Sequence, residues 1–324
     1  MSLSLSLVIC TYNNAPLLAR CLNAIANQTL DVALDWQVLV VNNNCTDDTE
    51  AVVSQYQSCI DHLAIVNESV QGLTPARVCG VKQTQTDWIA FIDDDCLIAP
   101  NWVAEAAKFA QSHPHCGAFG GRVILSWETA PPPFVEQFHY SFAEQEGGAE
   151  AKIIQCLVGA GIVINRHALI ETGWIDQPLL EDRIGKRLVS GGDVELALRL
   201  GAKRPLWYAP TCQLHHIIPS HRLSSGYLMQ INHALGTSKL YGDSMLWANS
   251  YQQWWFASLR EGIQQFQILT FEGMKALLGN QSKTVVVIKA YFWWGWLQGI
   301  WKLWMMDATQ RQAILGSAIP KESQ

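Results

Sequence analysis

The chain has little charge, no closely paired cysteines and no surplus of basic residues. Only 15% of its 324 residues are charged, and the net charge is −6. Nucleic-acid binding needs a basic surface, so we expect no nucleic-acid partner. The nine cysteines are odd in number, widely scattered and free of any CxxC pair. This usage argues against a disulfide scaffold or a zinc site and indicates a reduced, cytosolic protein.

Two further signals are missing. The N-terminal MSLSLSLVIC has neither a basic region nor a long apolar run, so we expect no secretory signal. The first predicted strand is followed by TYNNAP rather than by GxGxxG, which argues against an NAD-dependent dehydrogenase. What the chain does have is 49% hydrophobic residues, enough for a sizeable core.

The first 125 residues alternate between short apolar runs and amphipathic stretches. Continuous apolar strands separated by helices indicate a parallel sheet covered on both faces, hence an α/β fold. The predicted strands are residues 5–10, 36–41, 62–66 and 88–92, and the predicted helices are residues 17–25, 46–56, 75–84 and 101–111.

Polar residues follow three of these strands, at Asn13, at 42–44 and at 93–95. Ligands of such sheets bind at the carboxyl ends of the strands, so we expect these positions to gather at one edge. Adjacent carboxylates repel one another, and a divalent cation such as Mg²⁺ or Mn²⁺ would stabilise them. Asp93 and Asp95 can address one ligand site while Asp94 points elsewhere. The alternative is a helix N-cap cluster, although a cap needs one acid and would stand several residues later.

Asp193 follows two glycines in SGGDVELALRL, at the start of a predicted helix. It is a candidate general base, and the open alternative is an ordinary N-cap that accepts from the amides of Glu195 or Leu196. Glu195 and Arg199 are four residues apart in the favourable acid-first order, so we predict a structural ion pair.

His215 and His216 close a predicted strand at 211–215. Alternation places them on opposite faces, so at most one faces a given site. That histidine could complete a metal shell; the alternative is a half-buried histidine at a strand end.

From residue 126 the pattern is less regular. An apolar run at 153–164 predicts a strand with a close backbone approach at its glycines, residues 205–208 predict another short strand, and everything beyond about 224 is predicted helical.

The Trp-rich stretch at 284–306 is long enough to cross a bilayer, but Lys289 and Lys302 interrupt it. Three interpretations stay open: contact with a membrane surface, a helix packed on the rest of the protein or on a second copy, and a true membrane span.

Five motifs in order resemble the family 2 glycosyltransferases, which have the GT-A fold. They are LSLVICTYNN, VLVVNNNCTDDT, GLTPARVCG, WIAFIDDDC and SGGDVELALRL. The segments FGGRVILSWETAPPPF and VGAGIVINRHAL also resemble members of the family, including bacterial enzymes of exopolysaccharide assembly. The resemblance covers residues 5–222.

The resemblance implies a GT-A domain over 1–222, with a nucleotide-binding half at 1–125 and an acceptor half at 126–222. A helical extension over 223–324 follows. It also implies that the nucleotide-sugar site contains Thr11, Tyr12, Asn13, Asn42, Asn44, Arg77, Asp93 and Asp94.

The resemblance implies a metal bound by Asp95 with Asp93, and by His215 or His216. Ribose contact falls to Asp94 or Asp93. Asp193 matches the base that deprotonates the acceptor hydroxyl.

At three positions the sequence differs from the usual motifs of this family. Asn42 replaces the aspartate that accepts a hydrogen bond from uracil, which leaves the base preference open, because an amide can also donate. Val78 replaces an asparagine, and Gly192 replaces a glutamate that often precedes the base.

We therefore predict a metal-dependent, inverting glycosyltransferase that takes a sugar from a nucleotide diphosphate-sugar, a UDP-sugar first among them. The expected acceptor is a glycan or lipid-linked hydroxyl in polysaccharide or glycolipid assembly. The expected location is the cytoplasmic face of a membrane. The alternative is a nucleotide-sugar-binding regulator without turnover, which would have no need of Asp193.

Overall fold

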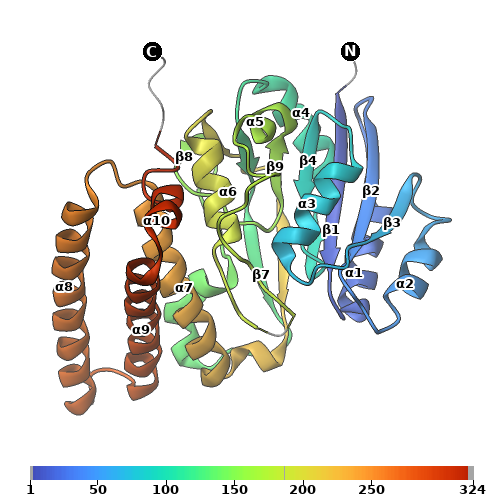
Figure 1. Cartoon of the computed structure of the whole chain (residues 1–324). Coiled ribbons are helices and arrows are strands. Elements are labelled where there is room, and N and C mark those ends of the chain that lie inside the picture. Colours follow the sequence, from blue (N-terminus) through green and yellow to red (C-terminus); the bar gives the residue numbers. More distant parts are fainter. Residues whose placement is uncertain (1–2, 186, 320–324) are drawn as a thin grey trace.

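The computed structural model describes residues 3–185 and 187–319 (Figure 1). The predicted alternation of strands and helices is confirmed in the first third of the chain. The strands are β1 (Ser4–Thr11), β2 (Asp35–Asn42), β3 (Leu63–Asn67), β4 (Trp88–Phe91) and β5 (Cys96–Ile98). The helices are α1 (Ala15–Ala26), α2 (Thr49–Tyr56), α3 (Leu73–Gln83) and α4 (Trp102–Ser112).

One large sheet has the strand order β3-β2-β1-β4-β9-β6-β10-β8. Its remaining strands are β6 (Ala118–Gly120), β8 (Lys152–Ile154), β9 (Ile162–Asn165) and β10 (Leu206–Tyr208). The first four strands are parallel, and β9 runs antiparallel between β4 and β6. The prediction of one strand over 153–164 was wrong. This run divides into edge strand β8 and central strand β9, because the chain turns near Gly161, whose φ is +75°.

A smaller sheet has the order β5-β11-β7, with β7 (Val123–Trp127) and β11 (Leu214–Ile218). Strand β11 begins three residues later than the predicted 211–215. A turn precedes it, in which the Cys212 amide donates to the Ala209 carbonyl at 3.1 Å. His215 and His216 therefore lie inside a strand rather than at its end.

The core fills both faces of the large sheet. Alternation along β1 sends Leu7 and Ile9 into one apolar cluster and Val8 into the other, and all three are fully buried. Helices cover both faces of the sheet (Figure 1). Among them are α5 (Arg166–Glu171) and α6 (Gly192–Gly201). The carboxyl ends of β1 and β4 are left at an edge of this covered sheet.

The C-terminal part is helical, as predicted. It contains α7 (Ser225–Met245), α8 (Tyr251–Leu277), α9 (Lys283–Met305) and α10 (Ala308–Ile314), after the 3₁₀ helices η1 (Pro133–Phe142) and η2 (Ser220–Leu223). Figure 1 shows α8 as the outermost helix, with α9 between it and α7.

Helices α7 and α9 approach closely through glycines. A Cβ atom on Gly295 would lie 1.8 Å from the His233 carbonyl oxygen, and one on Gly236 would lie 1.9 Å from the Phe292 oxygen. One face of α9 is thus packed against α7. Across residues 3–185 and 187–319, no helix combines the length and apolarity required for a membrane span.

Candidate active site

A cleft of about 500 Å³ opens at the edge of the sheet where β1 and β4 end. Its walls also include the start of α6, strand β11 and one face of α7. Most of the predicted site residues line it: Thr11, Tyr12, Asn13, Arg77, Asp93, Asp94, Asp95, Asp193 and His216. Asn42, Asn44 and His215 are not among the lining residues.

The three aspartates occupy the turn between β4 and β5, where the Cys96 amide donates to the Asp93 carbonyl at 3.0 Å. Asp94 points back to the first loop. Its carboxylate accepts from Thr11 Oγ1 and from Asn14 Nδ2, each at 2.6 Å. Burial, reinforced by the neighbouring charge of Asp95, raises the pKa of Asp94 to about 7. Asp94 thus binds the first loop, and the assignment of Asp93 and Asp95 to one ligand site stays a prediction.

Asp95 is buried and has two cationic neighbours. Arg222 donates to its Oδ2 at 2.8 Å, and His216 Nε2 lies 3.4 Å from its Oδ1. Burial opposes ionisation, but His216 and Arg222 together hold the pKa of Asp95 well below its usual range. Burial likewise opposes the charging of His216, but Asp95 outweighs it and raises the pKa of His216.

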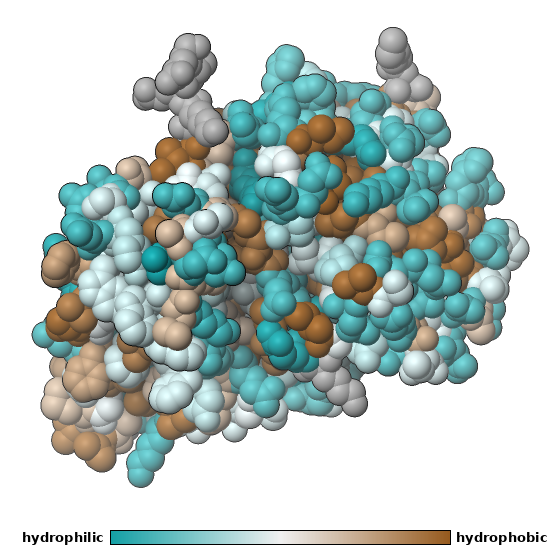
Figure 2. Space-filling view, viewed as in Figure 1, coloured by the Kyte–Doolittle hydropathy of each residue, from teal (hydrophilic) through white to brown (hydrophobic). Residues whose placement is uncertain are grey.

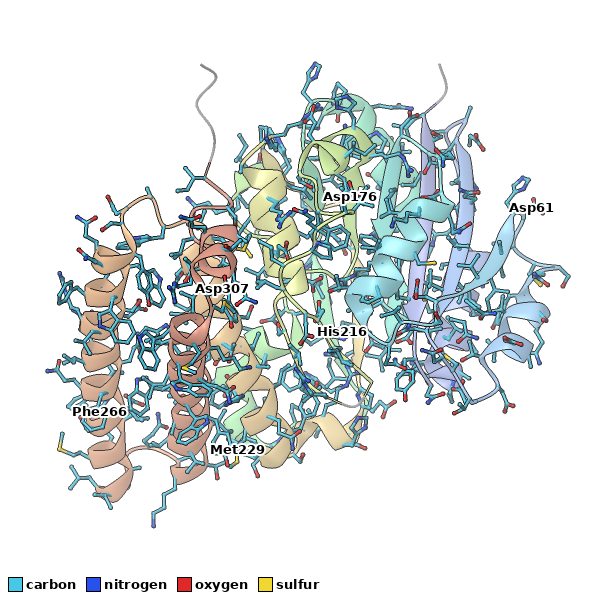
Figure 3. The ribbon with its side chains drawn as sticks, in the orientation of Figure 1. Asp61, Asp176, His216, Met229, Phe266 and Asp307 are labelled. Carbon is cyan, nitrogen blue, oxygen red and sulfur yellow. The ribbon has the colours of Figure 1, made fainter. Side chains whose placement is uncertain are left out.

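The two histidines of β11 face opposite ways, as predicted. His216 is buried near the centre of Figure 3, and its Nδ1 lies 2.7 Å from the Phe142 carbonyl oxygen. His215 is exposed, and its Nδ1 lies 3.0 Å from Ser126 Oγ. His216 is therefore the histidine of the pair that faces the cleft.

The donor atoms of Asp93, Asp95 and Cys96 lie within 4.8 Å of one another. In the described part of the chain, no other group of three such side chains is this close. The carboxylate oxygens are hard donors that suit Mg²⁺ or Mn²⁺. The Cys96 thiol does not, because burial keeps its pKa well above its ordinary value. Asp93 and Asp95, with His216 beside them, fit the predicted metal site.

Arg77 is 2% exposed and connects the triplet with α6. Its guanidinium pairs with Asp193, lies 3.5 Å from Asp182 and lies 3.6 Å from Asp93. It also stands over the ring of Phe91, 5.3 Å from the centroid. One cation thus holds three carboxylates from three segments, and these segments form facing walls of the cleft.

Asp193 lies in the first turn of α6, but it does not cap the helix. The N-cap residue is Gly191, and no side chain caps this end. The Asp193 carboxylate instead pairs with Arg77 through Oδ1, and its side chain stays 35% exposed. Any side chain at position 159 would overlap the Asp193 carboxylate, so Gly159 leaves space beside it.

The predicted structural ion pair on α6 is confirmed. Arg199 donates to Glu195 at 2.8 Å, and the Glu195 side chain is fully buried. Glu195 also accepts from the backbone amides of Leu179 and Leu180, at 2.7 to 2.9 Å. It therefore anchors the start of the loop that carries Asp182 and Arg183.

The three asparagines at the end of β2 bind backbone groups of their own turn and of the loop after β3. Asn42 Oδ1 accepts from the Cys45 amide at 2.8 Å, and Asn44 Nδ2 donates to the Ser69 carbonyl at 2.9 Å. Asn43 is the member of the trio that lines the cleft, and its Oδ1 accepts from the Gly72 amide at 2.8 Å. Asn13 Oδ1 joins the two loops by accepting from the Thr46 amide at 2.7 Å.

Sequence reasoning missed Asn14, Asp182, Arg183 and Arg222, which all line the cleft. Burial, together with the nearby charge of Asp193, raises the pKa of Asp182 to about 7. Asp182 and Arg183 stand in a polar loop without periodicity, and Arg222 follows a strand whose end was placed too early. Asn14 could have been predicted from the sequence, because it directly follows Asn13 in the motif LSLVICTYNN.

Comparison with known proteins identifies relatives of this chain. The model of Glycosyl transferase family 2 matches residues 6–173. Glycosyltransferase AglE of Haloferax volcanii is 34% identical over 99 residues, 30% of this chain and 32% of that protein. The glucosyl-dolichyl phosphate glucuronosyltransferase of the same organism is 22% identical over 203 residues, 61% of this chain and 63% of that protein. The match thus spans less than two thirds of either relative.

Solved structures agree on the architecture. The mannosyltransferase PcManGT from Pyrobaculum calidifontis, in complex with GDP-Man and Mn²⁺, superposes with a TM-score of 0.62 at 16% identity. The match covers 93% of this chain and 88% of that one. S. aureus TarS 1-349, in complex with UDP-GlcNAc, has a TM-score of 0.51 at 16% identity and covers 74% and 67%. These likenesses confirm the predicted GT-A fold.

Proposed function

Because this chain belongs to glycosyl transferase family 2, we propose that it transfers a sugar from a nucleotide diphosphate-sugar to an acceptor hydroxyl, with inversion at the anomeric carbon. The observation that supports this most is the pairing of Arg77 with Asp93 and with Asp193 across one cleft. One guanidinium thus contacts both the acidic donor site, through Asp93, and the carboxylate of Asp193.

In this proposal Asp193 takes the proton of the acceptor hydroxyl. The hydroxyl oxygen forms a bond to the anomeric carbon, and the bond from that carbon to the diphosphate breaks, releasing the nucleoside diphosphate. Arg77 holds Asp193 through Oδ1, which leaves Oδ2 for the acceptor beside Gly159. The position of the base is thereby fixed without occupying both of its oxygens.

Asp95 and Asp93, with His216, would hold Mg²⁺ or Mn²⁺. When bound, such an ion neutralises the charge that develops on the departing diphosphate. Asp94 is held toward the first loop by Thr11 and Asn14, and it is the carboxylate we assign to the ribose.

We propose a UDP-sugar as the donor. The TarS structure holds UDP-GlcNAc, and a structure of GalNAc-T7 holds UDP and Mn²⁺. The PcManGT structure holds GDP-Man instead, so a GDP-sugar is the competing donor to be tested. The first two loops would receive the nucleotide, with Tyr12 and Asn13 in the first and the turn ordered by Asn42 and Asn44 in the second.

For the acceptor, we propose a glycan or lipid-linked hydroxyl in polysaccharide or glycolipid assembly, with residues 1–222 as the GT-A domain and 223–324 as a helical extension whose first helix completes the cleft. The names of two relatives, a poly(ribitol-phosphate) beta-glucosyltransferase and a glucosyl-dolichyl phosphate glucuronosyltransferase, are consistent with this class. The proposed location is the cytoplasmic face of a membrane, with 284–306 near the surface.

The test begins with the purified full chain and a panel of UDP- and GDP-sugars, each with Mn²⁺, Mg²⁺ or EDTA. A cognate donor should raise the unfolding temperature with the metal and lose this effect with EDTA. Asp193→Asn should then lower transfer by at least about a hundredfold while donor binding persists.

Asp61→Asn, on an exposed carboxylate that does not line the cleft, is the control for loss of charge. Near-normal turnover in Asp193→Asn would contradict the base assignment. Donor binding without turnover in the unsubstituted chain, across acceptors of both classes, would favour the regulator instead.

A further inference from the structure

A second cavity, of about 360 Å³, lies between α7, α8 and α9. This volume is within the range of small-molecule sites, roughly 300–1,000 Å³. Its apolar walls come from Ile268 and Leu269 of α8, from Phe292, Trp293 and Trp296 of α9, and from Tyr140 of η1. Trp296 is buried.

The charged groups at the rim of this cavity are already paired. Lys289 lies 3.1 Å from Glu272, and Lys239 lies 2.5 Å from Asp243 and 3.9 Å from Glu261. The charged side chains that line the cavity itself are two lysines, Lys239 and Lys289, and two glutamates, Glu261 and Glu272, so the lining carries no net formal charge. The cavity therefore suits an uncharged, apolar group.

One stripe of α7 connects this cavity with the active-site cleft. Tyr227, Ile231 and Leu235 line the cleft, and Lys239 lines the cavity. The spacing of four residues places all four side chains on one face of the helix. Tyr140 lines both spaces, and its hydroxyl is fixed by a hydrogen bond of 2.7 Å to Asn232 Oδ1.

A second apolar surface lies on the face of α8 that is turned away from the cavity. Only Trp254 and Ser258 are buried in this helix of 27 residues. Large apolar side chains lie exposed along it: Phe256, Leu259, Ile263, Phe266, Phe271, Met274 and Leu277. Figure 2 shows hydrophobic side chains over the lower part of α8, and Figure 3 labels Phe266 on its outer side.

We propose that the cavity binds the hydrocarbon chain of a lipid-linked acceptor, whose hydroxyl-bearing head passes Tyr140 and reaches Asp193. This inference rests on the proposed function and deepens it by assigning the acceptor to the lipid-linked class. Continuity along α7 selects this occupant over a protein partner, because the stripe ends in the catalytic cleft rather than at a flat surface.

The test uses dodecyl β-D-glucoside with a diazirine at the end of its chain, added to the full-length protein below the concentration at which it forms micelles. Crosslinked residues are mapped by mass spectrometry. We expect label on Leu269, Ile268 and Trp293, displaced by plain dodecyl β-D-glucoside and not by butyl β-D-glucoside. Leu269→Trp, which fills the cavity, should lower labelling about tenfold.

The matched control is Phe256→Ser on the exposed outer face, which should leave labelling of the cavity within about twofold. Label confined to the outer face of α8, or label insensitive to chain length and to Leu269→Trp, would overturn the proposal. If Leu269→Trp fails to fold, the label map and the competition by chain length still decide.

Asp193→Asn separates this inference from the proposed function, because it should abolish transfer and keep the labelling. Labelling of the cavity without transfer from any nucleotide sugar would support the hydrocarbon-binding site and contradict the proposed function. Transfer to water-soluble glycans, together with an unlabelled cavity, would support the proposed function and contradict the hydrocarbon-binding site.

Discussion

Asp95 and His216 illustrate how a buried pair of opposite charges is held. The carboxylate has Arg222 on one oxygen and His216 near the other, and His216 is fixed in turn by the Phe142 carbonyl. A histidine oriented by a second hydrogen bond presents one defined ring nitrogen to the site.

The neighbouring histidines form a natural pair of variants. His216→Ala should weaken Mn²⁺-dependent donor binding by about 10–100-fold, because it removes the group next to Asp95. His215→Ala should leave binding unchanged, since this side chain is exposed on the other face of β11. Calorimetric titration of the donor with Mn²⁺ measures both, and equal losses in the two variants would refute the assignment.

At the scale of elements, residues 179–185 and 187–191 form little regular structure and depend on side-chain anchors. Glu195 holds its start through the amides of Leu179 and Leu180, and Asp182 holds its middle through Arg77. The α6 helix thus positions both Asp193, the proposed base, and the loop opposite it.

Glu195→Gln tests this anchor. Removing one charge of a buried pair typically costs about 3–5 kcal/mol, and Arg199 would be left without its partner. We expect a lower free energy of unfolding by urea and faster proteolysis within 179–191. Glu50→Gln, on an exposed residue of α2, is the control, and equal losses in both variants would argue against a specific anchor.

The close contact of α7 and α9 gives another test. Gly295→Ala should destabilise the protein by about 1–3 kcal/mol or more, because its Cβ would collide with the backbone of α7. Gly273→Ala in α8 has open space around it and should stabilise by about 0.5–1 kcal/mol. Urea unfolding measures both, and changes of the same sign would contradict the packing of these helices.

Much of the sheet was predictable because its strands are short apolar runs that end in polar turns. The residues 93–95, Arg77 and Asp193 were assigned to one site from motif order alone. Asp182 and Arg222 could not be assigned, because their side chains meet Arg77 and Asp95 only after the chain has folded. The exposed apolar face of α8 was not predicted either, because polar residues separate its apolar ones and leave no long apolar run.

At the scale of the whole molecule, charge is unevenly distributed. The chain carries −6 overall, yet residues 246–319 contain six lysines and arginines against three acidic residues. The exposed apolar face of α8 lies in this same region. Apolar side chains combined with positive charge favour contact with an anionic lipid surface.

Liposome co-sedimentation tests that contact. Replacing Phe256, Ile263 and Leu277 by serine should shift the protein from the pellet of anionic vesicles to the supernatant, and raised salt should have a similar effect. The control replaces Leu30, Val70 and Ile170, which are exposed apolar residues elsewhere. A shift of equal size in the control would argue against a specific membrane-facing surface.

The stripe of α7 affects how this protein can be divided. Tyr227, Ile231 and Leu235 form part of the cleft wall, although they belong to the helical extension. Glycine contacts join α7 to α9 backbone against backbone. A fragment ending at residue 222 would therefore have an incomplete cleft, and an extension transplanted from a relative would bring a new cleft wall with it. Chimaeras that exchange this segment would consequently change the wall of the cleft in which we propose that the acceptor binds.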